Sequence, residues 1–147
     1  MNAHQELNTD LINAIKAGNR AAMNELLARG ADANTRDSVG QTALMKAIEV
    51  FDIRVVEALL NKGADPNARD SYGQTALMKA WKFEGIAKAL IDKGADVNAT
   101  DNAGYTALKY ATPNKVALIL LEHGADADTP SGKAALKKAM GEGRTAT

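Results

Sequence analysis

Few side chains in this sequence have a type and spacing suited to chemistry. The two histidines, His4 and His123, stand far apart in the chain, and there is no cysteine. They therefore form no set with the spacing of a metal site. His123 directly precedes Gly124, a position that holds an ordinary surface lysine elsewhere in the chain. We expect both histidines to lie on the surface, and we predict no catalytic residue, no cofactor and no metal ion.

The aspartates recur in two phrases. Gly-Ala-Asp begins at Gly30, Gly63, Gly94 and Gly124, and Asp-x-x-Gly-x-Thr-Ala-Leu begins at Asp37, Asp70 and Asp101. Catalytic groups have to converge on one substrate, whereas these carboxylates are distributed evenly along the chain. A calcium loop would need alternating acidic ligands within one short segment, and none has them. The aspartates therefore indicate a structural repeat, and we predict that the chain is not an enzyme.

The repeat also defines the elements that would position these residues. A threonine stands just before an apolar helical pattern in three units, and we expect it to cap a helix: Thr42, Thr75 and Thr106. A second helical pattern follows and ends at a glycine such as Gly63, which can adopt the left-handed conformation. Turn-forming residues then lead to the next unit. One unit is therefore helix, turn, helix and extended loop, and such units bury their apolar faces by stacking.

This pattern resembles the ankyrin repeat, whose length is about 33 residues. The resemblance covers residues 7–140 and implies an all-α ankyrin repeat solenoid, with about four and a half stacked helix-turn-helix units and extended loops. Ala43 and Ala76 stand where the family usually has proline. Met45 and Met78 stand where it usually has a histidine that ties the loops together. We expect the loops to be less rigid for that reason.

We predict one ankyrin repeat domain, 1–147. It begins with an N-terminal capping repeat (5–36), which is followed by three repeats (37–69, 70–100 and 101–128). A C-terminal half-repeat (129–140) and a disordered tail (141–147) complete the domain. With the capping repeat counted as the first, the third and fourth repeats (70–100 and 101–128) are short, which predicts shortened helices and tight turns at Phe83–Gly85 and Thr112–Asn114. In the half-repeat, Ala134 takes the place of the capping threonine.

Composition excludes several classes of function. Lys+Arg and Asp+Glu each number 18, so the basic excess of a nucleic-acid binder is missing. No apolar stretch approaches the roughly 18 residues of a membrane span, and the first residues do not resemble a signal peptide. We therefore predict a cytoplasmic monomer that binds neither nucleic acid nor membrane.

The resemblance implies a scaffold that binds a partner protein through its concave face, built from loops and first helices, without catalysis. Two alternatives stay open: a secreted bacterial effector that targets host proteins, and a non-catalytic subunit or inhibitor of an enzyme. The Thr-Ala-Leu-Met phrase favours a bacterial source. The sequence does not identify the partner.

Repeat alignment places Tyr72 and Tyr105 on the concave face and Trp81 near it, and tyrosine and tryptophan are enriched in binding hot spots. Trp81 has a second interpretation, filling space left by the shortened turn. The full predicted site is Val39, Gln41, Tyr72, Gln74, Trp81, Lys82, Asn102 and Tyr105. Lys46 and Lys79 either pack their stems with exposed ammonium groups or form a basic stripe for an acidic partner.

Overall fold

The computed structural model describes residues 2–111 and 115–143, and its regular secondary structure there is helical apart from one isolated bridge between Arg36 and Thr42. The helices are α1 (Ala3–Lys16), α2 (Arg20–Ala28), α3 (Ala43–Glu49), α4 (Ile53–Asn61), α5 (Ala76–Lys79), α6 (Glu84–Asp92), α7 (Ala107–Ala111), α8 (Lys115–Glu122) and α9 (Pro130–Gly143). The predicted all-α class is confirmed.

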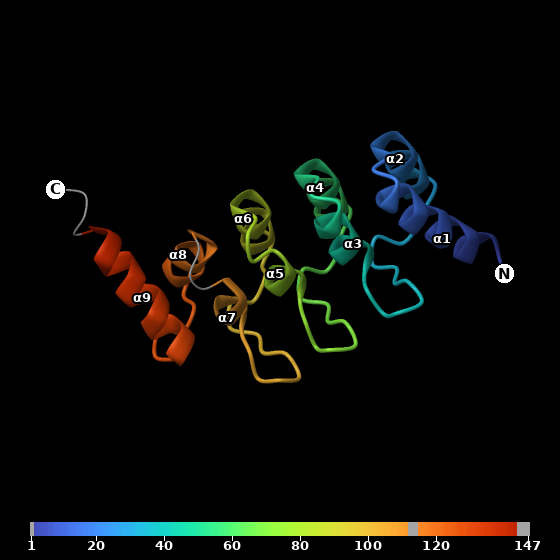
Figure 1. Cartoon of the computed structure of the whole chain (residues 1–147). Coiled ribbons are helices and arrows are strands. Elements are labelled where there is room, and N and C mark those ends of the chain that lie inside the picture. Colours follow the sequence, from blue (N-terminus) through green and yellow to red (C-terminus); the bar gives the residue numbers. More distant parts are fainter. Residues whose placement is uncertain (1, 112–114, 144–147) are drawn as a thin grey trace.

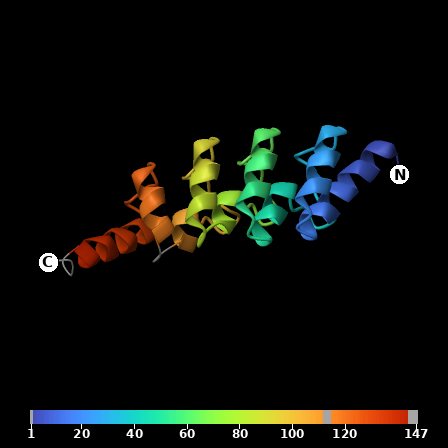
Figure 2. The same ribbon diagram turned by 90° about the horizontal axis from the view of Figure 1, so that it is seen from above.

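The helices form two rows. One row consists of α1, α3, α5, α7 and α9, each in contact with the next, and the other runs through α4, α6 and α8. Figure 1 shows the long loops projecting together on the side of the first row, with α1 and α9 at opposite ends of the stack. Figure 2, seen from above, shows the second helices standing side by side. Loops and first helices therefore share one face of an elongated molecule.

Small residues at repeated positions let the helices pack closely. Ala47, Ala80 and Ala111 occupy the same place in successive repeats, and each is fully buried at 0% exposure. The neighbouring leucines Leu44, Leu77 and Leu108 are buried as well. Because each repeat presents the same small and large side chains to the next, the core is continuous along the stack.

The first helix of repeat 70–100 is shortened as predicted, with 4 residues in α5 against 7 in α3, and α7 has 5 described residues. The predicted place of the turn in the third repeat was wrong. Helix α6 begins at Glu84, so Glu84 and Gly85 are helical, and the turn lies between Lys79 and Phe83. The equivalent prediction at Thr112–Asn114 falls outside the described residues.

The expected threonine caps have different outcomes. The Thr42 hydroxyl accepts a hydrogen bond from the Met45 backbone N–H at 3.2 Å, which confirms that cap. The Thr75 hydroxyl makes no such bond; among the described residues it has no hydrogen-bond partner, although the residue is only 2% exposed. That cap prediction was wrong, and the one at Thr106 stays a prediction.

Both ends of the stack differ from the predicted boundaries. Helix α9 begins at Pro130 because Thr129 caps it, with the hydroxyl accepting from the Gly132 N–H at 3.0 Å. The half-repeat is therefore capped by threonine, contrary to the prediction drawn from Ala134. Helix α9 also continues through Gly143, past the predicted end at residue 140, while 144–147 fall outside the described residues. At the other end, α1 begins at Ala3 because Asn2 caps it.

Candidate functional site

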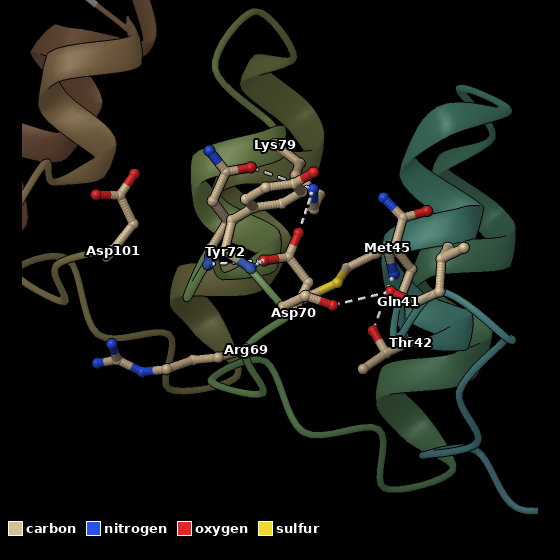
Figure 3. Close-up of polar contacts among 12 residues, drawn as sticks. Gln41, Thr42, Met45, Arg69, Asp70, Tyr72, Lys79 and Asp101 are labelled. Atoms are coloured by element: carbon tan, nitrogen blue, oxygen red, sulfur yellow. Dashed lines mark hydrogen bonds and ion pairs between the residues drawn. The ribbon is translucent and has the colours of Figure 1, made fainter. Parts of the chain in front are cut away.

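Each loop on the shared face is held by its own aspartate. The Asp70 Oδ1 atom accepts hydrogen bonds from the backbone N–H groups of Tyr72 and Gln74, both at 2.9 Å, and Oδ2 lies 2.9 Å from the Lys79 ammonium (Figure 3). Asp37 repeats this geometry, with Lys46 at 3.2 Å. The aspartate thus ties the loop to the first helix, which argues against the less rigid loops expected from Met45 and Met78.

These contacts also decide the role of the two lysines. The side chains of Lys46 and Lys79 are 14% and 17% exposed, and their charges are neutralised within their own repeats. They therefore form neither exposed ammonium groups nor a basic stripe. Burial alone would raise the pKa of Asp70, but the hydrogen bond from Lys79 and those from the loop outweigh it, so this pKa lies below its usual range. The pKa of Asp37 is lowered by the same balance.

In the fourth repeat a tyrosine takes the lysine position. Tyr110 donates its phenolic hydrogen to the Asp101 carboxylate, whose Oδ1 holds the backbone N–H groups of Ala103 and Tyr105. This hydrogen bond, together with burial, raises the pKa of Tyr110 above its usual range. Gln74 joins the two repeats, because its Nε2 lies 3.1 Å from the Tyr110 hydroxyl and its Oε1 accepts from Lys79 at 3.3 Å.

Neighbouring loops are tied to one another as well. The Asn102 backbone N–H donates to the Tyr72 carbonyl at 3.0 Å, and its side-chain amide donates to the Ser71 carbonyl at 3.2 Å. The Ser71 hydroxyl donates to the Val39 carbonyl at 3.0 Å. Asn102, a predicted partner-binding residue, therefore has a structural role in aligning the loop tips.

An asparagine ladder secures the base of the loops. Three asparagines each donate to a glycine carbonyl of the next repeat and accept an aspartate N–H from it: Asn34, Asn67 and Asn98. Because each bond spans two repeats, the ladder sets the register of one loop against the next. The exposed side chains of these loops are therefore carried on a rigid backbone.

The predicted site residues fall into separate groups. Val39 and Tyr72 lie at loop tips with 64% and 74% exposure. Tyr105 lies edge-on to Tyr110 at 6.2 Å between ring centroids. Within the part of the chain that the structure describes, Tyr72 makes no ring contact with the other aromatics. The aromatic patch expected from Tyr72, Trp81 and Tyr105 therefore stays a prediction.

A shallow groove of about 400 Å³ lies between α3, α5 and α7. Its aromatic lining is Phe51, Trp81, Phe83 and Tyr110, and Gln74 and Lys82 also reach it. It therefore contains three of the predicted residues: Gln74, Trp81 and Lys82. Gln41 lies outside it, half-buried in the loop before α3.

Sequence reasoning missed Phe51 and Phe83. Both are in the turns that join first to second helices, Phe51 directly before the cap of α4 and Phe83 at the cap of α6. An aromatic residue at a tight turn is a usable signal, because turns favour small and polar residues. The contact between the Phe51 and Phe83 rings could not be predicted, because the pattern of a single repeat does not show which side chains of two repeats meet.

The described residues hold no group of three or more His, Cys, Asp or Glu side chains placed to bind a metal ion. None of the described helices has the length and apolar character needed to cross a membrane.

A family model described as ankyrin repeats, in three copies, matches residues 11–101 and 50–131 of the sequence. These two overlapping stretches cover most of the chain. No curated protein matches the sequence at a significant level.

Proposed function

This chain belongs to the ankyrin repeat family, whose members generally serve as protein-interaction modules, and we propose that it binds a partner protein without catalysis. The binding surface in this proposal is the loop-and-helix face, made by loops 37–42, 70–75 and 101–106 with helices α3, α5 and α7. We further propose that it acts as a monomer in the bacterial cytoplasm and does not bind nucleic acid.

One observation carries this proposal: large apolar side chains stand exposed on a backbone that is held rigid. Val39, Tyr72, Trp81 and Tyr105 are 64%, 74%, 42% and 46% exposed. The loops that carry three of them are fixed by buried aspartates and by bonds between repeats. Aromatic side chains with little freedom left to lose contribute strongly to binding, because less entropy is lost on association.

The test is affinity capture from a lysate of the source organism with single variants of the immobilised protein. Tyr72→Ala and Tyr105→Ala should keep the parent's melting temperature and weaken capture of the same partner by about thirty-fold, as truncation of a hot-spot aromatic does. Trp81→Ala should also weaken capture.

Leu118→Ala is the matched control, since Leu118 is a similarly exposed apolar residue on α8, in the other row of helices. It should capture the partner as the parent does. If the two tyrosine variants also capture normally, or if Leu118→Ala is the variant that fails, the partner binds elsewhere on the molecule.

A further inference from the structure

Phe51 combines two features that disfavour folding. Its backbone has φ of +59°, and it is the only non-glycine residue with positive φ in the described chain. Glycine adopts this conformation easily, whereas a residue with a Cβ is strained there. The side chain is also 63% exposed. Strained backbone and exposed aromatic rings both concentrate at functional surfaces.

The Phe51 ring is held in place by the next repeat. It lies 4.9 Å from the Phe83 ring, centroid to centroid, at an angle of 47°. The Lys82 ammonium stands over the rings of Phe51, Trp81 and Phe83, at 5.6, 5.3 and 5.4 Å from their centroids. These four side chains, which we call the aromatic shelf, come from two turns that are far apart in sequence.

The charges around the shelf leave one cation without a carboxylate. Lys79 is paired with Asp70, whereas the Lys46 ammonium is shared between Asp37 at 3.2 Å and Glu49 at 3.4 Å, and Glu49 lines the same groove. No carboxylate of the described residues lies within ion-pair distance of Lys82, which contacts the three rings. The rings hold the Lys82 ammonium beside apolar surface, so that an acidic residue and an apolar neighbour of one segment can bind side by side.

We propose that the aromatic shelf binds an acidic segment of a partner protein, with a carboxylate on Lys82 and an adjacent apolar side chain on Phe51 and Trp81. This inference rests on the proposed function and adds the chemistry of the partner. Charge complementarity selects the acidic residue, and the apolar groove of about 400 Å³ accepts the neighbouring side chain.

Occupancy of the shelf can be followed directly, because Trp81 is the only tryptophan in the chain. The probes are unlabelled peptides of about ten residues. They are presented as an array in which Asp or Glu stands beside Leu, Met or Phe. A matched array carries Gln or Lys in place of each acid. The best binder from each array is titrated into the whole protein while the Trp81 emission is measured. We expect binders only among the acidic peptides, with affinity that falls as salt rises.

Three variants test the assignment with the selected acidic peptide. Lys82→Gln should weaken binding about ten-fold and flatten its salt dependence, since rim and groove charges act through complementarity. Phe51→Gly should weaken binding about thirty-fold while raising the melting temperature, so loss of binding cannot be attributed to unfolding. Lys88→Gln is the matched control, because Lys88 is an exposed lysine on α6, in the other row of helices and outside the groove; it should bind like the parent.

The inference is overturned if no acidic peptide changes the Trp81 emission, if Gln or Lys peptides bind equally well, or if Lys88→Gln loses as much affinity as Lys82→Gln. In each of those cases the proposed function is still supported if Tyr72→Ala and Tyr105→Ala weaken capture of the partner protein. If those variants capture normally as well, both proposals fail.

Discussion

Tyr110 is hydrogen-bonded to the Asp101 carboxylate at the place where the two preceding repeats use a lysine. The exchange replaces an ion pair with a neutral donor and brings a phenolic hydroxyl within reach of Gln74. A continuous series of polar contacts results, from Asp70 through Lys79, Gln74 and Tyr110 to Asp101. Two repeats are thereby joined across the face on which we place partner binding.

Tyr110→Phe should lower the free energy of unfolding by about 1–2 kcal/mol, because Asp101 is buried and would lose a partner of its charged form. Tyr110→Lys should cost less, since it restores the pairing of the other repeats. Urea denaturation measures both. Tyr105→Phe is the control. Tyr105 is 46% exposed, so water can replace any hydrogen bond that its hydroxyl makes. Equal losses for the two phenylalanine variants would rule out a special role for the Tyr110 hydroxyl.

Asp70→Asn should reduce the acid sensitivity of the fold. The pKa of Asp70 is lowered in the folded state, so its carboxylate stabilises the fold above the pKa of the unfolded chain, and this contribution is lost as pH falls through the folded pKa. The free energy of unfolding of the parent should therefore fall between about pH 5 and pH 2, and part of that slope should vanish in the variant. At neutral pH the variant should be less stable by about 1–2 kcal/mol, because Lys79 loses its charged partner.

The measurement is chemical denaturation at a series of pH values. Asp92→Asn, which removes an exposed carboxylate on α6, serves as the control and should follow the parent curve. A parent-like slope in Asp70→Asn would show that other carboxylates carry the acid response.

Thr42 and Thr75 occupy the same repeat position but should respond oppositely to valine. Thr42→Val removes the hydroxyl that caps α3 and should cost about 1 kcal/mol. Thr75→Val removes a buried hydroxyl that has no hydrogen-bond partner among the described residues, so it should be neutral or stabilising. Valine suits the extended backbone at both positions. Thermal unfolding of the two variants decides the matter, and a destabilised Thr75→Val would reveal a partner that its hydroxyl has in solution.

Gly132 and Gly141 lie in the same helix, α9, but substitution by alanine should change the stability of the fold in opposite directions at the two positions. A Cβ on Gly132 would lie 2.5 Å from the Ala127 Cα, so Gly132→Ala must push α9 away from the preceding loop and should cost about 1–3 kcal/mol. A Cβ on Gly141 would meet nothing within 4 Å, and Gly141→Ala should stabilise the helix by about 0.5–1 kcal/mol. Calorimetric melting of both variants tests the pair. A harmless Gly132→Ala would mean that α9 does not pack as closely as the structure has it.

The repeat phrases alone determined the architecture. Short local patterns specify helix pairs, and their regular return specifies stacking, because one pair cannot bury its apolar face. The glycine at the end of each second helix also follows from sequence, as Gly63 shows with φ of +90°. Exposure of Tyr72 and Tyr105 could be predicted for the same reason, since the repeat register places them on a loop or at a helix start.

Only the tertiary structure decided which side chains meet. Lys79 lies nine residues beyond Asp70, and the loop has to fold back before their charges pair. Phe51 and Phe83 belong to different repeats, so their contact depends on the stacking distance and on the shape of two turns. The third repeat is shorter than the second, and that change of length sets where the Phe83 ring lies. Local pattern encodes backbone conformation, whereas contacts between repeats depend on geometry accumulated over the whole stack.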